Sequence, residues 1–153
     1  MLNAIKMQQP VIYFDGVCNL CNGWIDWVLK VDRANVFKFA SLQGAAGQQL
    51  LNSNPELIVT IVTDDKLSNE SPEIFTTIIL NLKNKNLTET DAIIEILRLL
   101  PRPWSYFAPI LSGLPKALRN AAYRYVSRNR YHFFGTRNTC RIPTAFEKTK
   151  FLD

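Results

Sequence analysis

The feature that most constrains this chain is a C-x-x-C pair, Cys18 and Cys21, lying between a strand-like run and a helical pattern. Val11 to Phe14 is short and apolar, and Asp15-Gly16 is a turn signal. A helix that follows at once places Cys18 at or near its N-terminus, where unpaired N–H groups and the helix dipole favour a thiolate. Cys21 then lies one turn further on the same face, close enough to form a disulfide.

The first part of the sequence predicts a strand, a helix and a second strand. Apolar residues recur at helical spacing over 19–32, and residues 36–40 alternate as a strand does. Two strands joined by one helix favour a parallel pair with a right-handed crossover. Weaker signals predict a short helix at 41–51, a strand or an insertion at 57–63, a strand at 74–82, a hairpin turn at 84–86 and a short strand around Leu87.

The second part is predicted to be mostly helical. Residues 88–100 begin with polar side chains and continue as a buried helix that Pro101 stops. Residues 104–130 are predicted to be largely helical, with Pro109 and Pro115 as boundaries, and 131–153 to be an irregular tail. This order is that of a thioredoxin-like α/β domain, a sheet flanked by helices. We expect one domain over residues 1–153, with 104–153 as a mostly helical, basic extension packed on it.

Length and composition are those of an ordinary soluble protein of 153 residues. Residues 1–10 lack the apolar run of a signal peptide, and the longest apolar stretches are too short to span a bilayer. Three cysteines without an export signal do not suggest a disulfide scaffold, because a C-x-x-C pair in a reducing compartment is more often redox-active or metal-binding. We therefore expect a cytoplasmic protein without a transmembrane segment.

Charge is distributed unevenly along the chain. Residues 1–97 carry 7 Lys/Arg and 11 Asp/Glu, whereas residues 98–153 carry 11 and 2. The basic C-terminal third could attract an acidic partner. The simpler interpretation is a solvated helix face whose arginine stems pack on the core. Nucleic acid is not an expected partner, because few aromatic side chains are free for base stacking.

The run from Tyr13 to Cys21 resembles the signature of the DCC thiol-disulfide oxidoreductase family, Y-D-G-x-C-x-L-C, although Phe14 here precedes the aspartate. The resemblance continues through most of the chain, at residues 39–43, 88–100, 128–135, 140–143 and 151–152. It implies a thioredoxin-like fold and dithiol–disulfide exchange with protein thiols or disulfides, mostly in bacteria. Thioredoxins also carry a cis-proline loop, for which Pro72 is the candidate near the expected strand.

We expect Cys18 to be the attacking thiolate and Cys21 the resolving thiol, with no cofactor and no metal. Asp15 is a third candidate catalytic residue, because a buried carboxylate beside the pair could relay a proton to or from Cys21. An ionised Asp15 would instead raise the pKa of Cys18. Its simplest role is to close the turn together with Gly16.

Three other interpretations use the same residues. Cys18 and Cys21 could be inert helix cysteines. They could join Cys140 and the single histidine, His132, in a Cys₃His zinc site, although the spacing from His132 to Cys140 is too wide for a tight knuckle. The chain could also be a redox-switched binding adaptor that performs no turnover.

The aromatic residues of the basic tail lead us to expect that residues 124–140 fold back beside the cysteine pair. A free tail would leave their apolar area in water, at a cost of about 25 cal/mol per Å². Cys140 could then lie near the pair as a third thiol. The interpretation that we favour is a small buried hydrophobic residue.

Overall fold

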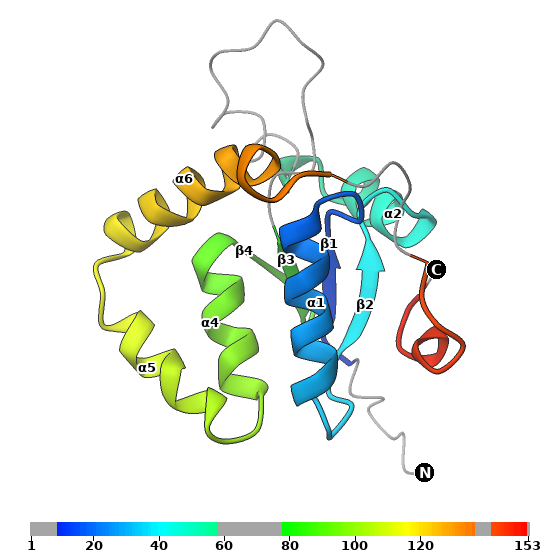
Figure 1. The fold of residues 1–153 in the computed structure, drawn as a ribbon, viewed down its shortest axis with the longest axis horizontal. Helices are drawn as coiled ribbons and strands as arrows, with labels where there is room; N and C mark the ends of the chain where they lie inside the picture. The colour runs from blue at the N-terminus through cyan, green and yellow to red at the C-terminus, as the bar shows by residue number, and fades with distance from the viewer. Residues whose placement is uncertain (1–8, 58–77, 137–141, 153) are drawn as a thin grey trace, which may run out of the picture.

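The computed structural model describes residues 9–57, 78–136 and 142–152 of the chain. Four strands form one mixed sheet in the order β2-β1-β3-β4. β1 and β2 are parallel and joined by helix α1, whereas β3 pairs antiparallel with β1 and β4 antiparallel with β3 (Figure 1). The strands are β1 (Val11–Phe14), β2 (Lys38–Ser41), β3 (Ile79–Leu82) and β4 (Lys85–Thr88). This arrangement confirms the predicted thioredoxin-like α/β fold.

Helices cover both faces of the sheet. Alternate residues of β1 point to opposite sides, so that Ile12 and Phe14 pack with one apolar cluster and Tyr13 with another. The first cluster is formed with α1 and α4, and the second with α2. The helices are α1 (Asn19–Val31), α2 (Ala45–Ser53), α4 (Glu89–Leu99), α5 (Phe107–Ser112) and α6 (Lys116–Phe134), with 3₁₀ turns at Trp104–Tyr106 and Glu147–Thr149. In Figure 1, α6 crosses above α4 and ends beside the start of α1.

Most predicted elements are present, and several boundaries differ. β2 begins at Lys38 rather than at residue 36, and the hairpin turn lies at Lys83-Asn84, whose φ values of 50° and 63° match a type I′ turn. β3 begins at Ile79. The predicted segment 57–63 lies outside the described residues from position 58 onward. Residues 74–77 and Pro72, the candidate for the cis-proline loop, are also outside them.

Two predictions in the C-terminal third were wrong. Pro109 is not a boundary but lies in the first turn of α5, where its missing N–H has no helical partner in any case. Residues 131–134 continue α6 instead of starting an irregular tail. The chain end is also anchored, because Phe151 forms a β-bridge with Phe39 and packs against its ring at a centroid distance of 5.6 Å.

The uneven charge of the sequence is partly balanced inside the fold. Lys116 and Arg119 of α6 pair with Asp91 at 2.8 and 2.9 Å. Arg124 pairs with Glu89 at 2.9 Å. Basic residues of the C-terminal third thus meet acidic residues at the start of α4. These contacts agree with a helix face whose arginines pack on the domain.

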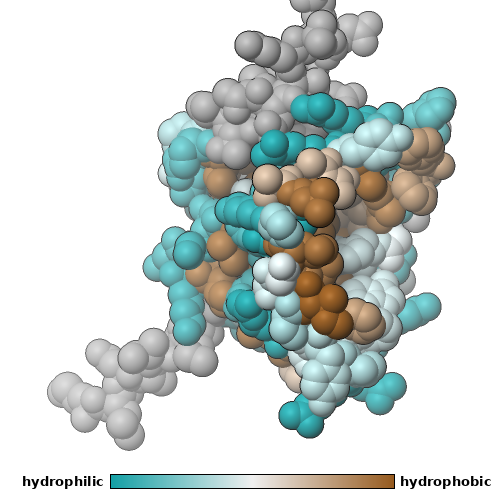
Figure 2. Space-filling model, turned by 90° about the vertical axis from the view of Figure 1, so that its left-hand side faces the viewer, coloured by the Kyte–Doolittle hydropathy of each residue, from teal (hydrophilic) through white to brown (hydrophobic). Residues whose placement is uncertain are grey.

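The face formed by α5 and α6 carries exposed apolar side chains. Figure 2 shows hydrophobic residues gathered along this face. The side chains of Ile110, Leu118 and Tyr125 are at least 60% exposed, and Leu114 and Val126 more than 40%. In the parts of the chain that the structure describes, no helix is both long and apolar enough to cross a lipid bilayer.

The approach of α2 to the end of β2 depends on one glycine. A Cβ at Gly47 would lie 2.3 Å from the carbonyl oxygen of Ser41 and 2.5 Å from Cα of Leu42, both backbone atoms. We expect Gly47→Ala to lower the free energy of unfolding by about 2–4 kcal/mol, because the helix must move away from the strand. Urea unfolding followed by circular dichroism measures this change.

Gly23, on the exposed face of α1, provides the matched control. A Cβ there meets nothing within 4 Å. Gly23→Ala should therefore stabilise the protein by about 0.5–1 kcal/mol, through helix propensity alone. An equal effect of the two substitutions would show that the packing of α2 on β2 is not as tight as described.

Candidate active site

Cys18 lies at the N-cap of α1, directly beyond the carboxyl end of β1. Its backbone is extended, with φ −79° and ψ 124°, and its Sγ accepts a hydrogen bond from the backbone N–H of Cys21 at 3.4 Å. Serine, threonine or aspartate normally fills this position with an oxygen acceptor. Here a sulfur accepts from the helix N-terminus, which favours its negatively charged form.

The pKa values of the two cysteines shift in opposite directions. The side chain of Cys21 hydrogen-bonds to Cys18 and lowers its pKa to about 6, against the opposing effect of burial. The backbone N–H of Cys21 and the charge of Arg130 lower it further, whereas the charge of Asp15 raises it. The pKa of Cys21 is raised far above its ordinary value, first by that same hydrogen bond and then by burial. At neutral pH the pair therefore combines a thiolate at Cys18 with a thiol at Cys21.

Asp15 is buried, with 1% of its surface exposed, and both carboxylate oxygens are occupied. Oδ1 accepts from the backbone N–H of Val17 at 3.0 Å and from the side-chain amide of Gln43 at 2.6 Å. Oδ2 accepts from Arg130 at 3.0 Å and from the hydroxyl of Tyr131. No hydrogen bond joins Asp15 to either cysteine in the described part of the chain.

Arg130 and Tyr131 reach this site from the last turns of α6, 115 and 116 residues after Asp15 in the sequence. The side chain of Arg130 is 3% exposed, and its guanidinium also lies over the ring of Tyr131. Burial and the hydrogen bond to Asp15 raise the pKa of Tyr131, so its hydroxyl stays protonated and donates. Arg130 and Tyr131 therefore present a fixed positive charge and a hydroxyl donor to the carboxylate of Asp15.

Arg130, Tyr131 and Gln43 were not predicted as site residues from the sequence. Gln43 follows β2 and links the turn from two sides, since its Oε1 accepts from the backbone N–H of Gly16 at 3.0 Å while its amide donates to Asp15. The only available signal was the resemblance at residues 39–43 and 128–131. A buried arginine cannot be distinguished by sequence from the exposed basic residues around it.

The end of α6 lies against the start of α1. The backbone N–H of Asn19 donates to the carbonyl of Gly135 at 3.3 Å, and its side-chain amide donates to Phe134 at 2.8 Å. Cys18 forms an isolated β-bridge with Thr136 and is fully buried. The expected return of residues 124–140 to the cysteine pair is thus seen for 124–136. Gly135, at φ 73° and ψ −178°, has a backbone conformation that only glycine adopts readily.

His132, one of the residues of the zinc alternative, is exposed on α6. Cys140 lies outside the described residues, so its predicted role stays a prediction. Within residues 9–57, 78–136 and 142–152, no three His, Cys, Asp or Glu side chains converge as metal ligands would. The zinc alternative would need Cys140 and is tested by metal analysis of the purified protein.

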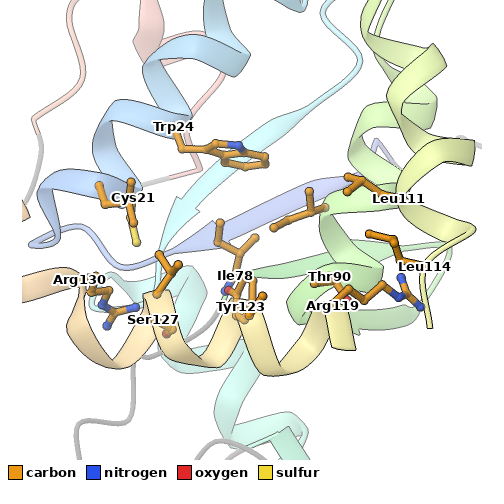
Figure 3. A pocket seen from close by; sticks show the side chains of 14 residues that line it. Cys21, Trp24, Ile78, Thr90, Leu111, Leu114, Arg119, Tyr123, Ser127 and Arg130 are labelled. Carbon is orange, nitrogen blue, oxygen red and sulfur yellow. The ribbon is translucent and has the colours of Figure 1, made fainter. Parts of the chain in front are cut away.

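A pocket of about 410 Å³ opens beside the pair and includes Cys21 in its wall. Figure 3 shows Cys21 and Arg130 at one end, with Leu111, Leu114 and Arg119 at the other. The pocket lies between α1, α4, α5 and α6, and its walls are almost entirely apolar. A site of this size and character is typical of small-molecule pockets.

Comparison with known proteins agrees with this geometry. The sequence model of the DCC1-like thiol-disulfide oxidoreductases matches residues 12–136, from β1 to just beyond α6. The chain belongs to this DCC1-like family. The matched range contains the cysteine pair together with Asp15, Arg130 and Tyr131.

Two relatives of this family member cover most of its length. "Uncharacterized protein YuxK" of Bacillus subtilis is 33% identical over 151 residues, which are 99% of each chain. "DCC family protein At1g52590, chloroplastic" of Arabidopsis thaliana is 29% identical over 138 residues, 88% of this chain and 70% of the plant protein. No solved structure matches the chain significantly.

The charges around Cys18 predict opposite effects for two substitutions in this DCC1-like protein. Arg130→Gln should raise the titration midpoint of the thiolate above about 6, because it removes a positive charge that stabilises the anion. Asp15→Asn should lower that midpoint, because it removes a negative charge while the amide oxygen can still accept from Arg130 and keep it in place. Each shift should be about one pH unit, and the thiolate absorbance at 240 nm measures it.

Arg128→Gln is the matched control, because it removes the same charge from an exposed position on the same helix. Its midpoint should stay close to that of the unmodified protein. A midpoint near 8.5 in the unmodified protein, the ordinary value for cysteine, would contradict the electrostatic account of Cys18.

Proposed function

We propose that this protein catalyses thiol–disulfide exchange through Cys18 and Cys21, with protein thiols or disulfides as substrates. The observation that supports this most directly is the position of Cys18 at the N-cap of α1, where its Sγ accepts from the backbone N–H of Cys21 at 3.4 Å. The pKa values of the two thiols shift in opposite directions, as this geometry would lead one to expect. A thiolate is the attacking species in exchange. Cys21, one helical turn away, stays protonated and therefore does not compete with Cys18 as the first nucleophile. The family match supports oxidoreductase chemistry, and the exchange with protein substrates is our proposal.

In the proposed reaction the Cys18 thiolate attacks one sulfur of a substrate disulfide. The substrate S–S bond breaks, its second sulfur leaves as a thiolate, and a Cys18–substrate mixed disulfide forms. Cys21 then loses its proton and attacks Cys18, which releases the reduced substrate with one thiol and one thiolate and leaves a Cys18–Cys21 disulfide. The proton from Cys21 is taken up by the departing thiolate, so that two electrons move from the protein to the substrate.

We propose that Asp15 is a positioning residue and not the direct proton acceptor for Cys21. Its oxygens already accept from Val17, Gln43, Arg130 and Tyr131. An acceptor must lie within hydrogen-bond reach of the proton it takes, and no such bond joins Asp15 to a cysteine in the described residues. Asp15 instead holds Arg130 near the pair, where the positive charge stabilises the Cys18 thiolate.

Full burial of Cys18 has a consequence for protein substrates. Thr136 forms a β-bridge with Cys18, so we propose that residues 134–136 move away from Asn19 to admit a substrate disulfide, which breaks the two hydrogen bonds that the described structure shows there. That movement costs little compared with the stability of a domain, since each such bond contributes about 1 kcal/mol. We place the activity in the cytoplasm, where a dithiol of this kind is kept reduced.

Substitution of single cysteines tests the proposal. Cys18→Ser should abolish the reduction of insulin, because the attacking sulfur is lost. In the Cys21→Ser variant, Cys18 should still attack the substrate, but mixed disulfides should accumulate, and peptide mapping detects them. Cys140→Ser is the control and should keep turnover within about twofold, because a dithiol completes the cycle alone.

Other results would contradict the proposal. Absence of Cys18-dependent turnover in the unmodified protein would favour a redox-switched adaptor over an enzyme. A Cys18–Cys140 disulfide, or a large loss of turnover in Cys140→Ser, would place a third sulfur in the mechanism.

A further inference from the structure

The pocket beside Cys21 is not used by the exchange reaction described above. Fourteen side chains line it: Leu20, Cys21, Trp24, Ile78, Thr90, Ile93, Leu111, Leu114, Arg119, Ala122, Tyr123, Val126, Ser127 and Arg130. None of them is acidic, and two are arginines. The volume of about 410 Å³ exceeds what a single substrate side chain needs and suits a small molecule.

The pocket is built from contacts that hold its walls in place. The hydroxyl of Tyr123 accepts from the backbone N–H of Ile78 at 3.0 Å, which fixes α6 against the start of β3. Arg119 and Arg124 bind Asp91 and Glu89 at the start of α4. A pre-formed pocket binds its ligand without the cost of ordering these elements first.

The two ends of the pocket differ chemically. One end contains the sulfur of Cys21, and the other contains Arg119 (Figure 3). Only Nη2 of Arg119 pairs with Asp91, whereas Nε and Nη1 have no hydrogen-bond partner in the described structure. Buried donors without partners are rare in proteins, and a ligand with an acceptor group at this end would satisfy them. Arg119 and Arg130 are eleven residues apart on α6, or about 16 Å along the helix axis.

We propose that this pocket binds an elongated apolar dithiol with a terminal carboxylate, of which dihydrolipoate is the simplest example, and that this molecule reduces the Cys18–Cys21 disulfide. The apolar chain would occupy the pocket, the carboxylate would lie toward Arg119, and the sulfurs would lie against Cys21. This inference rests on the proposed exchange function and names the electron donor that completes its cycle.

The reaction balances without another reactant. A thiolate of the ligand attacks the sulfur of Cys21, the Cys18–Cys21 bond breaks, and Cys18 leaves as a thiolate. The second thiol of the ligand loses its proton and attacks the ligand's first sulfur, which closes the ligand disulfide. Cys21 is released and takes that proton. Attack from this side is favoured because Cys18 has the lower pKa and is the better leaving group.

Access to the sulfurs also favours a small donor in this pocket. Cys18 is fully buried beside Thr136, whereas Cys21 is 7% exposed and forms part of the pocket wall. A donor in the pocket can therefore approach the disulfide at Cys21 while residues 134–136 stay in place. A protein disulfide, by contrast, needs those residues to move.

Reduction of the oxidised protein by dihydrolipoate, dihydrolipoamide and dithiothreitol tests the proposal, with tryptophan fluorescence as the signal. We expect saturation with dihydrolipoate and a second-order rate constant about tenfold or more above that for dithiothreitol, which has no chain to bind. Dihydrolipoamide should react more slowly than dihydrolipoate, because it lacks the carboxylate. Equal rates for all three dithiols would overturn the proposal.

Two neighbouring alanines on α6 provide matched variants. Both are exposed, but Ala122 lines the pocket and Ala121 does not. Ala122→Trp should lower the ratio of the dihydrolipoate rate to the dithiothreitol rate by about tenfold or more, and Ala121→Trp should keep it within about twofold. An equal ratio in both variants would overturn the proposal.

Binding can be separated from exchange. In the variant with Cys18→Ser and Cys21→Ser, calorimetry should detect lipoate binding that Ala122→Trp abolishes, and the absence of binding would overturn the pocket assignment. Reduction of insulin driven by dithiothreitol tests the exchange function by itself. If that reaction proceeds and lipoate neither binds nor reacts preferentially, only the pocket proposal fails. If it does not proceed, the exchange function fails and the inference fails with it.

Discussion

The buried ion pair between Arg130 and Asp15 is the interaction on which this site depends. It joins two side chains that are 3% and 0% exposed and lie 115 residues apart in the sequence. Removing charges from water is costly, and further hydrogen bonds to the two charged groups offset part of that cost. Gln43, Val17 and Tyr131 provide such bonds to Asp15. The pair therefore fixes the end of α6 against the turn that carries the cysteines.

That fixed contact also controls the charge felt by Cys18. Arg130 stabilises the thiolate and Asp15 opposes it, so the two partly cancel at the sulfur. The larger contributions come from Cys21, through its side chain and its backbone N–H. The ion pair thus supplies position and a modest field, whereas the helix N-terminus supplies the hydrogen bonds. Neither contribution requires a metal or a cofactor to lower the pKa of the thiol.

The extent to which this fold could be predicted depends on how local each signal is. The strand at residues 11–14, the helix after Cys18 and the helix at 89–99 have strong periodic patterns, and the sequence predicts all three. Helix α6 is different, because its buried residues are Asn120 and Arg130 rather than apolar ones. The spacing of apolar residues cannot predict a helix face that is buried through ion pairs and hydrogen bonds. The continuation of α6 to Phe134 and the partner of Asp15 could therefore not be predicted from periodicity.

The pocket has no signature in the sequence for a similar reason. Its walls come from four helices, from Leu114 between α5 and α6, and from Ile78 just before β3. Helix α6 contributes six side chains and each other helix one to three, all unremarkable in isolation. The excess of basic residues after position 98 is compatible with a surface for an acidic partner, but the simpler interpretation is a helix face whose arginines pack on the core. Within the described fold, Lys116, Arg119, Arg124 and Arg130 bind Asp91, Glu89 and Asp15. Those pairs hold α6 across α4 and α1, and the apolar space enclosed beneath the helix is the pocket that reaches Cys21.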